Sequence, residues 1–258
     1  MEKKEVNVLA IILFILLLCS LCYIGYDKLN TKEIKCKDTN QKETEVSENT
    51  YNKDGIFIKD LMSKIYVRTT TREENQLYIK DSTTIKDLNE NYVNFLVITR
   101  MDKSSEIRAF SKEDFDETAI EMFGEKLNRS EKIVSLCGLT YKLFGDYYDR
   151  DGIGEGCGGA RVRWFDKITN VTNDTDHIYI YQKKGFQCGE NICKNVKKGT
   201  EAYNPYEGYD VVGEIDFVNK TEEQMVDEVI DQLHEYKFTF KLDKANNNYY
   251  FEKVERVS

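Results

Sequence analysis

Hydrophobic residues are spread very unevenly along the chain, and the longest apolar run lies near its start. The run begins at Val6, ends at Tyr26 and holds no charged residue. As a helix that rises about 1.5 Å per residue, it would span roughly 30 Å, the thickness of a bilayer core. We therefore expect a transmembrane signal anchor over 6–26, preceded by a short cytoplasmic tail over 1–5. A cleaved signal peptide is the alternative, although its apolar region is usually shorter, about 7–15 residues.

The pattern changes after this run. Residues 27–54 are mostly polar and charged, and apolar side chains such as Leu29, Val46 and Tyr51 are too sparse to build a core. We expect a flexible polar stalk here, followed by a folded domain over 55–258. Lysines lie on both sides of the apolar run, so their count alone does not orient it in the membrane. Long domains translocate largely regardless of charge, which favours an extracytoplasmic domain.

The first part of the domain predicts two strands and two helices. Short runs rich in β-branched residues predict strands near 56–58 and 65–67. Apolar residues at three- and four-residue spacing predict a helix over 84–101, with Asp87 as its N-cap. A second helix is predicted to begin at a capping box of Ser111 and Asp114 and to end at Gly124.

From residue 132 onward the pattern becomes β. Runs of β-branched and aromatic residues over 132–145, 160–168 and 176–186 predict strands. A short helix is predicted over 221–233, with Thr221 and Gln224 as its capping box. The alternating residues of 236–242 and 249–254 predict a closing hairpin. This order is typical of an α+β domain whose helices pack on a curved antiparallel sheet, a layout that cystatin and NTF2-like domains share.

Charge restricts the partners. The formal net charge is −9, and both signs are interspersed along the chain. Nucleic-acid binding needs clustered Lys and Arg against phosphates, and the sequence holds no basic run with interleaved aromatic residues. We therefore expect no nucleic-acid partner. The partners that we expect are the membrane and an unknown protein or envelope component.

The cysteines suggest a disulfide framework. Cys188 and Cys193 bracket the tight polar segment CGENIC, and the simplest scheme pairs these two and then Cys137 with Cys157, although sequence alone does not fix the pairing. Disulfides suit an oxidising compartment. Cys36 is left in the stalk, as a free thiol or as a link between two chains of a dimer. The alternative is a cytosol-facing zinc domain in which the same four cysteines bind the metal.

The glycine-rich segment GIGEGCGG, residues 152–159, resembles a phosphate loop. Such a loop needs a helix after the motif, whereas ARVRWF predicts a strand. A helix-loop-helix calcium site fails because its first and last positions are not carboxylates. An irregular calcium site of Asp146, Asp149, Asp151 and Glu155 stays open. The pattern favours a turn in which glycines give the backbone freedom around a cysteine, so we expect no metal and no cofactor.

Candidate catalytic residues are few. The two histidines are His177 and His234, and the sequence contains no HExxH, GxSxG or Walker motif. A nucleophilic site would have to bring Cys137 or Cys157 to His177, and no local pattern supports that. Aromatic residues near the end of the chain could form a carbohydrate-stacking face, but strand packing explains them better. We expect no enzyme, and the alternative is a hydrolase or transferase that acts on envelope polymers.

The order of the segments resembles a group of uncharacterised single-pass, surface-anchored proteins of low-GC Gram-positive bacteria. The segments are the anchor, the stalk, TIKDLNENYVNFLVI, SKEDFDETAIEMFG, CGLTYKL with GCGG, FQCGENICK and YKFTFKLDKANNNYYFEKVE. The resemblance implies a bacterial cell-surface protein with one membrane helix, and it implies no activity and no functional residues. The sequence thus predicts a membrane-anchored extracytoplasmic binding or structural domain, stabilised by disulfides, whose ligand it does not identify.

Overall fold

The computed structural model describes residues 51–65, 73–78, 80–101, 107–128, 130–135, 139–151, 163–195 and 209–257. The predicted anchor over 6–26, most of the predicted stalk, Cys36, Cys137, Cys157 and the glycine-rich segment lie outside these residues. Within the described ranges, no helix is long and apolar enough to cross a membrane.

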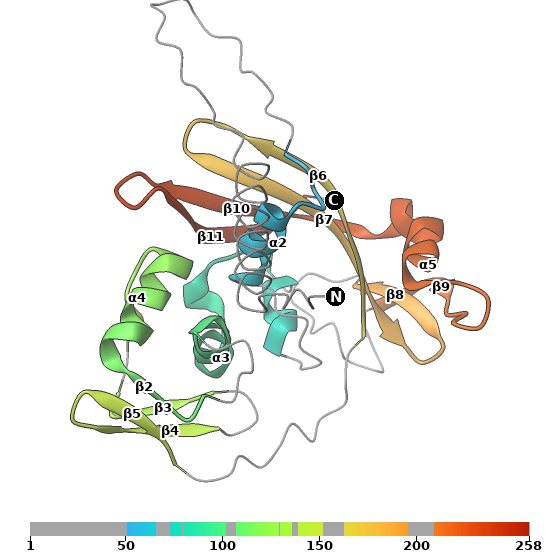
Figure 1. Ribbon diagram of the computed structural model, residues 1–258. Helices are drawn as coiled ribbons and strands as arrows, with labels where there is room; N and C mark the ends of the chain where they lie inside the picture. Colours follow the sequence, from blue (N-terminus) through green and yellow to red (C-terminus); the bar gives the residue numbers. More distant parts are fainter. Residues whose placement is uncertain are drawn as a thin grey trace, which may run out of the picture. The chain divides into compact units, whose positions relative to one another are not determined.

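The described residues form helices and antiparallel strands, which confirms the predicted α+β class (Figure 1). The helices are α2 (Ile56–Ser63), α3 (Glu90–Met101), α4 (Lys112–Phe123) and α5 (Glu222–Val229), with 3-10 turns η1 (Glu73–Tyr78), η2 (Ile85–Asp87) and η4 (Ile230–Gln232). The strands are β1 (Ser82–Thr83), β2 (Ala109–Ser111), β3 (Lys132–Val134), β4 (Thr140–Phe144), β5 (Tyr147–Arg150), β6 (Trp164–Asn173), β7 (His177–Cys188), β8 (Asn191–Asn195), β9 (Tyr209–Glu214), β10 (His234–Asp243) and β11 (Asn248–Arg256).

The strands form two sheets. The larger has the order β1-β11-β10-β7-β8-β9, and β6 pairs with β7 on the edge opposite β10. The smaller has the order β2-β5-β4-β3. The sequence predicted one sheet and did not separate these two, because the strands of the smaller sheet are only three to five residues long.

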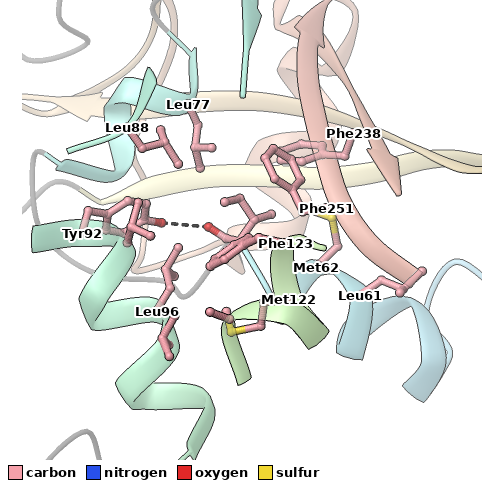
Figure 2. Close-up of a cluster of buried hydrophobic side chains, with 14 of the residues drawn as sticks. Leu61, Met62, Leu77, Leu88, Tyr92, Leu96, Met122, Phe123, Phe238 and Phe251 are labelled. Carbon is pink, nitrogen blue, oxygen red and sulfur yellow. Dashed lines mark hydrogen bonds between the residues drawn. The ribbon is translucent and has the colours of Figure 1, made fainter. Parts of the chain in front are cut away.

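One face of the larger sheet, here called the inner face, is covered by α2, α3 and α4. Ile178 and Ile180 of β7 lie on this face, as do Phe238 and Phe240 of β10, and all four are fully buried. The helices contribute apolar side chains that meet these strands (Figure 2). They include Leu61, Met62, Leu96, Met122 and Phe123. The main core of the protein is therefore the layer between the inner face and these helices.

The opposite face, here called the outer face, is covered at one end by α5. Phe165 of β6 and Ile192 of β8 pack there against Met225, Val226, Val229 and Leu233. The backbone of β9 approaches α5 closely here. A Cβ atom added at Gly213 would lie only 2.6 Å from Val229 Cγ1, so the position requires a residue without a side chain. This second core is smaller than the inner one, and among the described residues it covers the part of the sheet formed by the start of β6, by β8 and by β9.

All three predicted helices form, although α3 begins at Glu90 and not at residue 84, and α5 ends at Val229 and not at residue 233. Ser111 caps α4 by accepting a hydrogen bond from the Asp114 N–H, and α4 ends at Gly124, whose φ of 73° is left-handed. Thr221 and Gln224 form the predicted capping box of α5. The predicted N-cap at Asp87 is wrong.

The side chain of Asp87 instead closes the turn η2 by accepting from the Thr84 N–H. The cap of α3 lies two residues later, at Asn89, whose Oδ1 accepts from the Asn91 N–H at 2.8 Å. A short polar side chain serves equally well in a turn and at a helix N-terminus, so the sequence pattern placed the cap two residues too early.

The strand predicted near 56–58 is also wrong, because these residues begin α2. Ile58, Leu61 and Met62 are buried at helical spacing, a period that the enrichment in β-branched residues obscured. Ile65 is fully buried just after α2, and residues 66 and 67 lie outside the described residues. Tyr51, which the sequence assigned to the stalk, packs against the inner core.

Candidate binding surface

The part of the outer face that α5 does not cover carries aromatic and polar side chains. Successive side chains of a strand point to opposite faces of the sheet. Because Ile178 and Ile180 lie in the inner core, the side chains of His177, Tyr179 and Tyr181 point to the outer face. All three are partly exposed, in contrast to their buried neighbours.

Neighbouring strands extend this surface in register. Tyr179 pairs with Thr172 of β6, and Tyr181 pairs with Asn170 of β6 and with Lys237 of β10. Paired residues have their side chains on the same face. We call this surface the tyrosine face. It consists of Asn170, Thr172, His177, Tyr179, Tyr181 and Lys237.

A turn between β6 and β7 fixes the rings at one end of the tyrosine face. The Tyr179 hydroxyl donates to Asp174 Oδ2 at 2.6 Å, and His177 Nδ1 lies 3.1 Å from Asp174 Oδ1. The rings of His177 and Tyr179 are stacked, with centroids 5.9 Å apart and an interplanar angle of 21°. The two rings are therefore held in a fixed, nearly parallel arrangement before any ligand binds.

The same contacts explain the electrostatics of the turn. The hydrogen bond from Tyr179, together with those from backbone N–H groups and from His177, lowers the pKa of Asp174 to about 2. In return, hydrogen bonding to this carboxylate raises the pKa of Tyr179 to about 12. Asp174 is thus a charged acceptor that organises the turn, and Tyr179 keeps its proton at neutral pH.

The charges on and beside the tyrosine face largely compensate one another. Lys237 Nζ lies 5.7 Å from the centroid of the Tyr179 ring and 3.0 Å from Glu255 Oε2. Lys253 Nζ lies 3.0 Å from the other oxygen of Glu255. A surface that joins aromatic rings to compensated charges and to amide and hydroxyl groups suits a neutral ligand that is rich in hydroxyl groups.

His177 was the histidine considered for a nucleophilic site, and the structure places it in this turn. Its Nε2 lies 3.8 Å from Glu252 Oε2, so carboxylates flank both ring nitrogens. The cysteines that such a site would need, Cys137 and Cys157, lie outside the described residues. The other histidine, His234, contacts Arg256.

Of the predicted disulfides, one falls within the described residues. Cys188 and Cys193 are joined by a disulfide at the end of the β7–β8 hairpin, with Cα atoms 5.9 Å apart. This is the pair that the segment CGENIC predicted. The bond lies on the inner face, where Cys193 is fully buried beside Trp164 and Phe186. A zinc site of four cysteines would need both residues as thiolates, whereas the structure has them joined to each other.

The carboxylates considered for an irregular calcium site are engaged elsewhere. Asp151 pairs with Lys142 at 2.7 Å, and Asp146 lies 3.5 Å from Lys112. Asp149 Oδ1 accepts from the Arg150 N–H, and Glu155 lies outside the described residues. Among the described residues, no group of three or more His, Cys, Asp or Glu side chains is arranged to hold a metal ion.

One buried charge serves the packing of the inner layer. The side chain of Lys64 is fully buried, and its Nζ donates to Asn248 Oδ1 at 2.9 Å and to the Tyr249 carbonyl at 2.7 Å. It also lies 3.5 Å from Glu121 of α4. Burial lowers the pKa of Lys64, against the opposing effect of Glu121. This side chain ties the end of α2 to α4 and β11.

Tyr179 and Tyr181 were not among the residues that the sequence predicted for a binding surface. The aromatic enrichment near the end of the chain suggested stacking residues there, whereas Phe238, Phe240 and Phe251 fill the core. The signal was present in HIYIYQ, where two isoleucines alternate with two tyrosines. A strand that buries the isoleucines must present the tyrosines on the other face.

Comparisons with known families, curated proteins and solved structures find no match to this chain.

Proposed function

We propose that this protein is a membrane-anchored, extracytoplasmic binding domain whose tyrosine face binds a neutral polysaccharide. The observation that supports the ligand class is the pairing of Tyr179 and Tyr181 with hydrogen-bonding neighbours on an open sheet face. Sugar rings offer C–H faces that pack on aromatic rings and hydroxyl groups that bond to polar side chains. An extended sheet face offers these contacts to several sugar units at once.

Two further features support the location. The apolar run over 6–26 is long enough to anchor the chain, and the disulfide Cys188–Cys193 suits an oxidising compartment. The resemblance to surface-anchored proteins of Gram-positive bacteria agrees with both. The arrangement of helices on an antiparallel sheet is also analogous to that of cystatin and NTF2-like domains. Those folds host many functions, so the fold does not choose the ligand.

Binding measurements on the full-length chain in detergent test the proposal. The probes are insoluble chitin, insoluble β-glucan and soluble dextran, which are all neutral. We expect binding to at least one of them, and we expect Tyr179→Ala and Tyr181→Ala each to weaken it by roughly three- to tenfold, because a lost aromatic contact is worth about 0.5–1.5 kcal/mol. The double variant should bind more weakly than either single variant.

Tyr147→Ala is the matched control, because Tyr147 is 61% exposed on the smaller sheet, where β5 begins. It should leave the affinity unchanged. The proposal would be overturned if none of the three polysaccharides bound, or if the Tyr179→Ala/Tyr181→Ala double variant bound as tightly as the unchanged chain. Equal losses in the Tyr147→Ala variant and in the tyrosine-face variants would also contradict it.

A further inference from the structure

A groove follows the edge of β6 and runs between α2 and α5. The cavity measures about 470 Å³. Residues of β6 line its floor, the segment that enters α2 lines one wall, and the first turn of α5 lines the other. The lining residues used below are Lys53, Lys59, Lys167, Ile168, Glu222 and Glu223. The groove lies at the edge of the larger sheet, whereas the tyrosine face lies on its open surface.

The floor of the groove is the edge of a strand. Among the described residues, β6 pairs with β7 alone. The Gln187 N–H donates to the Arg163 carbonyl. In an antiparallel pair every second residue exchanges hydrogen bonds with the partner strand, so Arg163, Phe165 and Lys167 face β7 with their backbone groups. By the same alternation, the backbone N–H and C=O of Ile168 point away from β7 and toward the open edge. An edge of this kind can accept a further strand.

The open part of this edge is short. The register of the β6–β7 pairing shifts between Ile168 and Asn170, and such a bulge bends the strand. Beyond the bulge, the Val171 N–H donates to the side chain of Asn170 at 2.9 Å. Within the described ranges, the edge is therefore unpaired near Ile168, and the side chain of Asn170 occupies it just beyond.

The two walls carry opposite charges. Lys53 and Lys59 lie on the α2 side, and Glu222 and Glu223 lie on the α5 side. Lys167 of the floor is held by α5, because its Nζ lies 2.6 Å from Asp227 and 3.7 Å from Glu223. Asp54 also lines the α2 side and partly offsets its two lysines. Asp166 of the floor is a second lining carboxylate, which accepts from Gln182 at 2.9 Å and lies 3.9 Å from the buried Lys184. The α2 wall itself is thus net basic. The α5 wall is acidic, with Arg163 lying 3.7 Å from Glu222 beside it.

We propose that this groove binds an extended peptide of a partner protein, which adds to β6 as a short strand. Alternate side chains of an added strand point to opposite sides. One set would face the lysines of the α2 wall, and the other set would face the glutamates of the α5 wall. The peptide that fits is one in which acidic and basic residues alternate.

The test uses the full-length chain and a fluorescently labelled six-residue peptide of alternating Glu and Lys with blocked ends. We expect it to bind, and a peptide of the same composition with its charges in two blocks should bind about tenfold more weakly. Two further peptides carry N-methyl groups on alternate backbone nitrogens, one in each of the two possible registers. Because methylation removes the N–H groups that pair with β6, binding should be lost for one of the two methylation registers.

A variant with Lys53→Glu and Lys59→Glu should weaken binding of the alternating peptide by about tenfold or more. The matched control is Lys86→Glu with Lys132→Glu, which changes the net charge equally at two exposed positions outside the groove, and it should leave binding unchanged. The proposal is overturned if the alternating peptide does not bind, if both methylation registers bind like the unmodified peptide, or if the control variant loses as much affinity as the groove variant.

Discussion

The two faces of the larger sheet differ in how they are covered. The inner face is closed by three helices, and Phe238, Phe240 and Phe251 beneath them are at most 2% exposed. Among the described residues, α5 covers the outer face at one end, and Tyr179 and Tyr181 are partly exposed at the other. The apolar outer residues Phe165 and Ile192 pack against α5, whereas the aromatic residues Tyr179 and Tyr181 do not belong to this core. The inner face holds the larger buried core, and the outer face is the surface to which we assign the proposed ligand.

The largest expected effect compares the two cores directly. Phe238→Ala should lower the free energy of unfolding by about 3–5 kcal/mol, because it leaves a large cavity in the inner core. Val226→Ala beneath α5 should cost about 1.5–2 kcal/mol, since it removes less apolar volume. Denaturant unfolding of both variants checks the order. A larger loss for Val226→Ala would show that α5, and not the inner layer, dominates stability.

The disulfide should have the next largest effect. Cys188 and Cys193 are five residues apart, and closing so short a loop stabilises the folded chain by about 2 kcal/mol in the chain-entropy description. The double variant Cys188→Ser/Cys193→Ser should unfold at correspondingly lower denaturant. Alkylation before mass analysis of the unchanged protein, isolated without reductant, should find both cysteines blocked. Two free thiols would contradict the extracytoplasmic location.

Two helix caps of the same kind, a hydroxyl that accepts from the N–H three residues later, allow the stability of the two layers to be compared. Ser111 caps α4 on the inner side, and Thr221 caps α5 on the outer side. Replacing either by Ala should cost about 1 kcal/mol, because a helical N–H loses its acceptor. Thermal unfolding measures both. If Thr221→Ala left stability unchanged while Ser111→Ala lowered it, then α5 would unfold independently of the inner layer.

The smallest effect concerns acid stability. The pKa of Asp174 is lowered to about 2 in the folded chain, first by the hydrogen bond from Tyr179, from an ordinary value of 3.8. A lowered folded-state pKa stabilises the protein above pH 4, and that stabilisation is lost as the pH falls from about 4 to about 2. Asp174→Asn should therefore show a smaller drop in melting temperature over this interval than the unchanged chain. An equal drop in both would show that Asp174 does not contribute.

Local signals predicted the fold well where one side-chain interaction decides the structure. The caps at Ser111 and Thr221 and the left-handed Gly124 follow from short-range chemistry, as does the turn that brings Cys188 to Cys193. Tertiary packing decided the rest. Residues 56–58 have β-branched character, but burial of Ile58 against the sheet requires the helical period. The smaller sheet depends on pairing between short strands, which a local pattern does not encode.

The candidate surface was predicted less well than the fold. The alternation in HIYIYQ implies that two tyrosines share a face, but the sequence does not show whether another element covers that face. Whether the face is covered depends on the position of α5. The apolar side of α5 packs on Phe165 and Ile192, and Tyr179 stays partly exposed. His177 was recognised as a candidate, but its partner Asp174 was not, because the pair forms only when the β6–β7 turn closes.

Hydroxyl-radical footprinting of the full-length chain tests the central claim most directly. The modification rates of Tyr179, Tyr181 and Tyr147 are compared with and without the polysaccharide that binds. The account predicts that the ligand protects Tyr179 and Tyr181 and leaves Tyr147 unchanged. Protection of Tyr147 with no protection of the other two would place the ligand elsewhere and would contradict the assignment of the tyrosine face as the binding surface.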